Sequence, residues 1–114
     1  MQRSTLNGRN FECYSEDPFL GAELAVAYIT GLQSQGVGAT VKHFIGNDSE
    51  YQRTTVSSDI EERSLREIYT PPFEAAVKRA KTWALMTSYN RSPAASASSP
   101  WSRCRSRAAS WRCL

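Results

Sequence analysis

The strongest constraint on the fold is the order in which helix-like and strand-like segments follow one another. Residues 17–33 have the signals of an amphipathic helix, and the short apolar run over residues 37–44 is typical of a buried strand. A second helix is expected over residues 58–79, and a second strand over residues 83–88. Strands that alternate with helices predict an α/β fold of parallel βα units, with both faces of the strands buried.

Local signals define the ends of both helices. Asp17 is a suitable N-cap, Pro18 suits the first helical position, and Gly36 is a natural stop. The second helix is expected to begin with a capping box at Ser58–Glu61 and to be interrupted at Pro71–Pro72. The expected apolar face of the first helix consists of residues at every fourth position: Leu20, Leu24, Tyr28 and Leu32.

Polar pairs lie at the ends of both predicted strands. Lys42 and His43 come at the end of the first strand, and Tyr89 and Asn90 follow the second. In α/β folds with parallel strands, ligands bind at the carboxyl ends of the strands. Because the two pairs occupy equivalent positions, the sequence predicts one shared site.

The charges divide the chain of 114 residues near Arg91, because all 11 acidic residues precede it. Residues 92–114 are rich in Ser, Ala and Pro and have no helical or strand period, which favours disorder. We therefore divide the chain into a domain over residues 1–91 and a tail over residues 92–114. A shift of reading frame near residue 91 or 92 is our hypothesis for the composition of this tail.

Several other classes of protein have little support in the composition. Three cysteines, Cys13, Cys104 and Cys113, form neither a disulfide framework nor the spacing of a metal site. The chain has no signal-peptide pattern near Met1, and its longest apolar run is too short to cross a membrane, so the compartment stays open. The main rival function is nucleic-acid binding by the tail, through phosphate contacts and base stacking, although we do not favour it. The residues concerned are the arginines Arg103, Arg105, Arg107 and Arg112, interleaved with Trp101 and Trp111.

Three sequence blocks occur together in one known family. Residues 8–18 (GRNFECYSEDP), residues 42–48 (KHFIGND) and residues 86–90 (MTSYN) resemble, in order and spacing, the amino-terminal barrel domain of glycoside hydrolase family 3. The resemblance covers essentially all of residues 2–91. It implies a fragment of a TIM-like (β/α) barrel and a retaining hydrolase acting on β-glucosides or related sugars. A barrel of this kind needs about 250 residues and eight strands, whereas this sequence predicts two strands, with residues 2–4 as a candidate third.

The resemblance also implies which residues bind the sugar. Arg9, Lys42 and His43 match family residues that bind hydroxyls in the −1 subsite, and Met86 and Tyr89 match residues that line it. Charged donors, an imidazole and a phenol hydroxyl suit the many hydroxyls of a pyranose. The resemblance implies no metal and no cofactor. A non-catalytic sugar-binding module remains an alternative to a hydrolase.

No catalytic residue is assigned, because a retaining glycosidase needs two carboxyl groups about 5 Å apart across the scissile bond. The family's nucleophile is the aspartate of a Ser-Asp-Trp motif, which this chain lacks. The nearest match, Ser58-Asp59-Ile60, has no tryptophan, and Asp59 is better explained by the start of a helix. We therefore expect this chain by itself to be catalytically incomplete.

Purely structural roles remain open for the same residues. Lys42 can be a solvated lysine at a strand end, beside a packed His43. Arg9 can serve as a structural partner of Glu12, Glu16 or Asp17, and Met86 can simply pack. A polar loop after a strand is usually solvated, which is the favoured interpretation of Asn47, Asp48 and Glu50.

Overall fold

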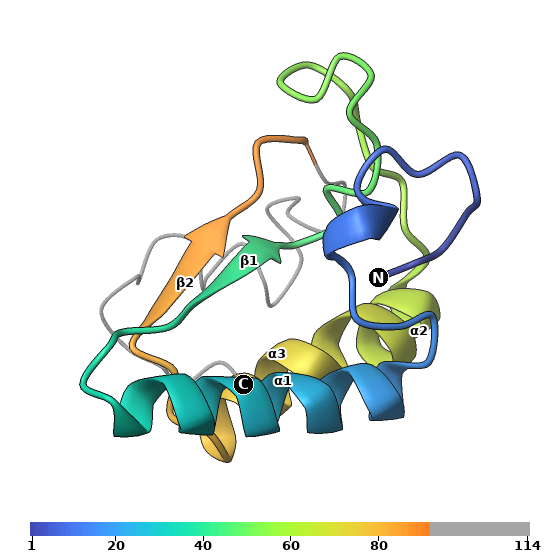
Figure 1. Cartoon of the computed structure of the whole chain (residues 1–114). Helices are drawn as coiled ribbons and strands as arrows, with labels where there is room; N and C mark the ends of the chain where they lie inside the picture. Colours follow the sequence, from blue (N-terminus) through green and yellow to red (C-terminus); the bar gives the residue numbers. More distant parts are fainter. Residues whose placement is uncertain (92–114) are drawn as a thin grey trace.

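The computed structural model describes residues 1–91, and the main elements follow the order helix, strand, helix, strand (Figure 1). Helix α1 spans Pro18–Ser34, strand β1 spans Thr40–Phe44, helix α3 spans Thr70–Lys78 and strand β2 spans Ala84–Thr87. Three short helical segments are the 3₁₀ helix η1 (Asn10–Glu12), helix α2 (Glu62–Ser64) and the π-helix η2 (Leu65–Tyr69). The predicted α/β class is confirmed.

Strands β1 and β2 form a parallel two-stranded sheet, so both carboxyl ends lie at the same edge. The sheet lies on one side of the helix pair α1 and α3 (Figure 1). Residues of β1 alternate between exposed and half-buried up to His43, and Met86 and Thr87 of β2 are exposed. The expectation of burial on both faces is therefore wrong for residues 1–91, because helices cover one face only.

The predicted ends of α1 are confirmed. The Asp17 carboxylate accepts a hydrogen bond from the backbone N–H of Phe19 at 2.8 Å, and Pro18 occupies the first helical position. Gly36 follows the helix with φ of 75°, a left-handed conformation that favours glycine, and its N–H donates to the carbonyl of Gln33 at 3.0 Å.

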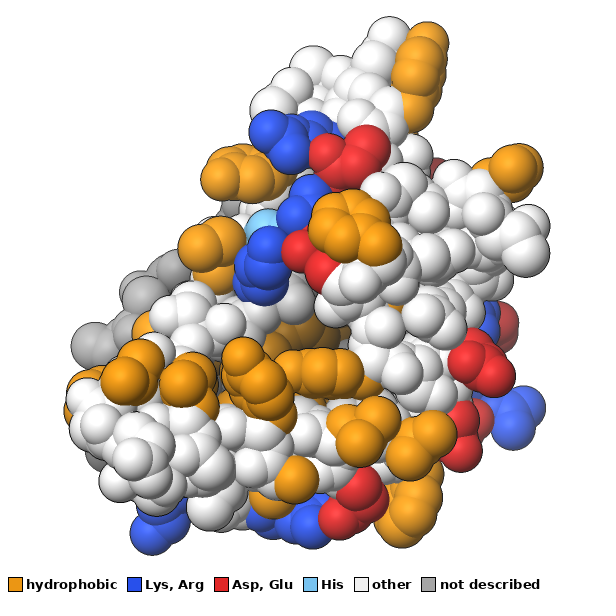
Figure 2. Space-filling view, in the orientation of Figure 1, with side chains coloured by type: hydrophobic (Ala, Val, Ile, Leu, Met, Phe, Trp, Pro, Cys, Tyr) orange, Lys and Arg blue, Asp and Glu red, His pale blue; other side chains and the backbone are white. Residues whose placement is uncertain are grey.

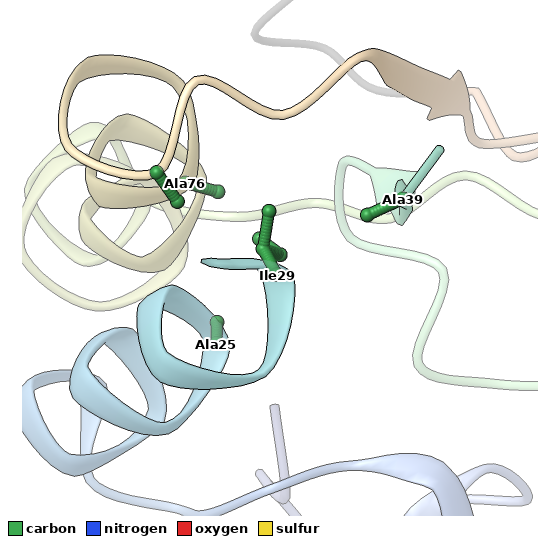
Figure 3. Packing of buried hydrophobic residues seen from close by; sticks show 5 residues of the cluster. Ala25, Ile29, Ala39 and Ala76 are labelled. Atoms are coloured by element: carbon green, nitrogen blue, oxygen red, sulfur yellow. The ribbon is translucent and has the colours of Figure 1, made fainter. Parts of the chain in front are cut away.

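The buried face of α1 differs from the predicted one. The buried residues are small or β-branched, and three of the four predicted residues, Leu20, Leu24 and Tyr28, are exposed. Figure 3 shows Ala25 and Ile29 of α1 near Ala76 of α3 and Ala39 before β1, which belong to one hydrophobic cluster. The alanines leave little side-chain bulk between α1 and α3. Leu20, Leu24 and Tyr28, each one position away and so turned by roughly 100° around the helix, lie outside the contact, whereas the fourth predicted residue, Leu32, is partly buried against the cluster.

The start of the second helical region differs from the predicted capping box. Ser58 caps no helix, because its hydroxyl donates to the carbonyl of Gly46 at 2.8 Å. Helix α2 starts only at Glu62, after Glu61, whose side chain makes no cap hydrogen bond. Asp59 precedes that helix and accepts a hydrogen bond from Ser57, so a helix start does not explain it.

The predicted interruption at Pro71–Pro72 is also wrong. Both prolines lie in the first turn of α3, where a missing N–H is tolerated. The wider π-helical turn Leu65–Tyr69 leads into α3 without a break. The hydroxyl of Thr70 donates to the carbonyl of Leu65 at 2.7 Å across this turn.

The remaining expectations concern the two ends of the chain. Residues 2–4 form no strand, and the N–H of Gln2 donates to the carbonyl of Ser15 at 3.2 Å. The predicted domain boundary after Arg91 and the expected disorder of residues 92–114 concern a segment outside the described residues. Across residues 1–91, no helix is long and apolar enough to cross a membrane.

Candidate functional site

The structure brings together four of the five site residues that the sequence predicts. Lys42 and His43 lie at the end of β1, and Tyr89 lies just after β2, with 6.2 Å between the ring centroids of His43 and Tyr89. Arg9 immediately precedes η1, and an acidic residue, Glu12, connects it to Lys42. In Figure 2 blue and red side chains gather around the single pale-blue histidine. The expected juxtaposition at the carboxyl ends of the strands is therefore present.

Arg9 has two carboxylate partners. Its Nε donates to Glu12 and its Nη1 donates to Glu50. The Arg9 side chain is 14% exposed, and the hydrogen bond with Glu50 is the main cause that raises the pKa of its guanidinium. The structural pairing considered for Arg9 is thus correct for Glu12, and the cation stays fixed and charged.

Lys42 shares Glu12 with Arg9. The distance from Lys42 Nζ to Glu12 Oε2 is 2.8 Å, and the Lys42 side chain is 43% exposed. The hydrogen bond with Lys42 is the largest cause that lowers the pKa of the Glu12 carboxyl, and the bond with Arg9 adds to it. The Lys42 ammonium is therefore held by Glu12 on one side and remains accessible to a ligand on the other.

His43 is held in its neutral form. Burial lowers its pKa first, and the positive charges of Arg9 and Lys42 lower it further, against opposing contributions from Glu12 and Glu50. A neutral imidazole has one nitrogen that donates and one that accepts. His43 therefore suits a hydroxyl group, which does both.

Arg53 and Glu50 join the site from the loop after β1. Arg53 Nη1 lies 2.9 Å from Glu50 Oε2, and its guanidinium Cζ lies 5.6 Å from the centroid of the Tyr89 ring. Sequence reasoning assigned no role to Arg53 and favoured a solvated Glu50. The only signal was their position in a polar stretch after a strand, which does not distinguish a binding loop from a solvated one.

In the same loop Asn47 is buried and Asp48 is hydrogen-bonded. Asn47 is 7% exposed, and the Asp48 carboxylate accepts a hydrogen bond from the hydroxyl of Tyr69. Burial, followed by this bond, raises the pKa of Tyr69 to about 12. The favoured interpretation of a solvated loop is therefore wrong for Asn47 and Asp48. A cavity of about 90 Å³ opens here, and its lining includes Arg9, Glu12, Lys42, His43 and Asn47.

Met86, the fifth predicted residue, lies on β2 and is exposed. Within residues 1–91, the ion pairs and ring contacts described above join the other four residues without it. Its role stays a prediction. Residues 1–91 contain no group of three or more His, Cys, Asp or Glu side chains that could hold a metal ion.

Comparison with known proteins relates this chain to one family of hydrolases. The pattern of the "Glycosyl hydrolase family 3 N terminal domain" matches residues 1–104. A β-glucosidase of Rhizobium radiobacter is 67% identical over 91 residues, and thermostable β-glucosidase B of Acetivibrio thermocellus is 55% identical over 91 residues. Each alignment covers 80% of this chain but 11% and 12% of the relative, so the chain spans about a tenth of their length.

Solved structures agree with the sequence comparison. β-Glucosidase 3B from Thermotoga neapolitana in complex with glycerol has a TM-score of 0.79 and 50% identity, covering 82% of this chain and 13% of that chain. The β-glucosidase of Kluyveromyces marxianus in complex with glucose has a TM-score of 0.78 and 49% identity, covering 81% of this chain and 11% of that chain. The described α/β unit is accordingly a fragment of a TIM-like barrel. The chain belongs to glycosyl hydrolase family 3 and matches the N-terminal domain of that family.

Proposed function

We propose that residues 1–91 provide one side of a sugar-binding site in a glycoside hydrolase that cleaves β-glucosides or related sugars. The observation that carries this proposal is the grouping of Arg9, Lys42, His43 and Tyr89 at the carboxyl ends of β1 and β2. Arg9 and Lys42 are charged donors, and neutral His43 donates and accepts. Met86 is proposed to line the same subsite.

The relatives support a sugar as the ligand. Two similar structures, of β-glucosidases from Thermotoga neapolitana and Kluyveromyces marxianus, are complexes with glucose. A pyranose offers several hydroxyls at fixed spacing, and hydrogen bonds from charged donors are roughly twice as strong as those between neutral groups. Glucose is thus the first ligand to test.

The carboxylates of the site suit binding better than catalysis. A general acid needs a raised pKa, whereas the bonds with Lys42 and Arg9 lower the pKa of Glu12, and the bond with Arg9 lowers that of Glu50. Asp48 is occupied by Tyr69. These shifts argue against a general acid among these residues, and the Ser-Asp-Trp motif of the family's nucleophile is lacking. We therefore assign no catalytic residue within residues 1–91, and propose that the catalytic pair of the family lies beyond them.

The binding proposal is tested by titrating the chain with glucose and comparing Lys42→Ala with Lys78→Ala. Both lysines form an ion pair with one glutamate and have similar exposure, 43% for Lys42 and 53% for Lys78, but Lys78 lies on α3 away from the site. Lys42→Ala is expected to weaken glucose binding by about tenfold, the loss of one charge-assisted hydrogen bond. Equal binding by both variants would contradict the proposal.

The catalytic part is tested with an aryl β-glucoside. The purified chain is expected to release no aryl alcohol above the rate of the uncatalysed reaction, because two carboxyl groups in the required roles are lacking. Release of aryl alcohol by the purified chain above that rate would show that the proposed lack of catalytic residues is wrong.

A further inference from the structure

The five charged side chains around the site form a continuous array in which two glutamates each connect two cations. Glu12 connects Arg9 with Lys42, and Glu50 connects Arg9 with Arg53. We call these five residues the charge array. Arg9 is its centre, because it is bound by both glutamates.

Each glutamate uses its two carboxylate oxygens for different cations. Glu12 Oε1 accepts from Arg9, and Oε2 lies 2.8 Å from Lys42 Nζ. Glu50 Oε1 accepts from Arg9, and Oε2 lies 2.9 Å from Arg53 Nη1. A glutamine at either position keeps one acceptor oxygen, replaces the other with a donor and carries no charge, so it cannot pair with the two cations through separate oxygens.

The members of the array come from separate parts of the chain. Arg9 and Glu12 lie at η1, Lys42 lies in β1, and Glu50 with Arg53 lies in the loop that follows β1. The lack of a side chain at Gly8 makes room for Glu50 beside Arg9, since a Cβ on Gly8 would lie 3.0 Å from Cγ of Glu50. The relative orientation of the three cations therefore depends on the glutamates.

Stability alone does not account for the array. The side chains of Lys42 and Arg53 are 43% and 48% exposed, and ion pairs of such exposed cations contribute little to stability, because they are screened and lose side-chain entropy. The three cations would repel one another and turn toward water without the carboxylates between them. The array costs side-chain freedom in return for a fixed set of donors beside His43 and Tyr89, which favours a binding role.

We infer that Glu12 and Glu50 are positioning residues, which orient Arg9, Lys42 and Arg53 for a sugar without contacting it themselves. This inference rests on the proposed function for its ligand. It assigns the two glutamates a role in affinity that is separate from both catalysis and folding.

The first test observes the array without any sugar. NMR of the Arg9 Nε–H in the chain is expected to show slow exchange with water, which becomes faster in Glu12→Gln and in Glu50→Gln. Glu67→Gln is the matched control, because Glu67 pairs with Arg63 on an exposed helical surface. Exchange at Arg9 that is the same in all four proteins would overturn the array.

The second test measures glucose binding. Glu12→Gln is expected to weaken it by about tenfold, whereas Glu67→Gln leaves it unchanged. In a Lys42→Met background the loss caused by Glu12→Gln should be clearly smaller, since part of its effect passes through Lys42. The same loss in both backgrounds would show that Glu12 acts independently of Lys42 and would overturn the inference.

The two tests separate the inference from the proposed function. If the unaltered chain binds no glucose, the proposed function is wrong, while exchange at Arg9 still decides whether Glu12 and Glu50 hold the cations. If glucose binds and Glu12→Gln and Glu50→Gln bind it normally, the sugar site stands and the positioning role is refuted.

Discussion

The guanidinium of Arg53 lies over the ring of Tyr89, with 5.6 Å between Cζ and the ring centroid. Arg53 belongs to the loop after β1, and Tyr89 follows β2. This contact connects the charge array to the aromatic side of the site, where the Tyr89 ring also neighbours His43 at 6.2 Å. The segments that follow β1 and β2 therefore contribute side chains to one surface, which neither segment forms alone.

The Arg53–Tyr89 contact predicts different effects for two changes at Tyr89. Tyr89→Phe keeps the ring face under Arg53, whereas Tyr89→Leu removes it. Because a cation–π contact at an exposed position contributes about 0.5–1 kcal/mol, Tyr89→Leu should bind glucose roughly two- to fivefold more weakly than Tyr89→Phe. A calorimetric titration of both variants checks this, and indistinguishable affinities would rule out a role for the ring face.

The packing of α1 predicts a contrast between two apolar residues of the same helix. Ile29 is 3% exposed and lies in the hydrophobic cluster, whereas Leu24 is 41% exposed. Ile29→Ala should lower the free energy of unfolding by about 2–4 kcal/mol, since it leaves a cavity, and Leu24→Ala by less than about 1 kcal/mol. Urea unfolding measures both, and a larger loss for Leu24→Ala would mean that the predicted leucine face is the buried one after all.

The two helix starts predict a second contrast. The Asp17 carboxylate caps α1 through the N–H of Phe19, whereas Glu61 at the start of α2 makes no side-chain cap bond. Asp17→Ala should lower the free energy of unfolding by about 1 kcal/mol, whereas Asp17→Asn should leave it nearly unchanged, because asparagine also caps helices well. Glu61→Ala should be nearly neutral. Thermal unfolding of the three variants tests this, and equal losses for Asp17→Ala and Glu61→Ala would refute the assigned cap.

His43 is the single histidine of the chain, so its titration can be observed without overlap from another imidazole. Burial and the neighbouring cations lower its pKa in the folded state below the ordinary value of about 6.5. Its contribution to stability is therefore complete above about pH 6.5 and is lost as the pH falls through the folded pKa. The pKa values of Glu12 and Glu50 are lowered from 4.5, so their contributions are lost only below that pH.

We accordingly expect the free energy of unfolding to fall as the pH drops below about 6.5 in the unaltered chain, and to change less in His43→Gln. NMR titration of the imidazole should give a midpoint below 6.5. A midpoint at or above that value would mean that burial and the charges of Arg9 and Lys42 do not dominate at this position.

The sequence predicted those features that depend on local signals. Asp17, Pro18 and Gly36 define the ends of α1 through capping and backbone conformation, which neighbouring residues determine. The two strands were recognisable as short apolar runs, and the parallel arrangement followed from the alternation with helices. Lys42, His43 and Tyr89 could be expected to meet because both pairs ended a parallel strand.

Features that depend on tertiary contacts could not be predicted from the sequence. Ser58 has the spacing of a capping box, but its hydroxyl donates to Gly46, a contact created by the return of the chain toward β1. Leu20, Leu24 and Tyr28 of α1 have the correct period but are exposed, because α3 packs against the alanine side, and only Leu32 of the predicted face packs against the core. Arg53 and Glu50 join the site only through the path of a loop, which residue type and spacing do not determine.

The central claim is that the ends of β1 and β2 bind a sugar, and the most direct measurement is a crystal structure of the chain with glucose. The claim predicts glucose hydroxyls within roughly 2.7–3.2 Å of the donor atoms of Arg9, Lys42 and His43, with Glu12 and Glu50 still paired to their cations. Glucose bound elsewhere on the chain, or bound here without hydrogen bonds to Arg9, Lys42 and His43, would contradict it.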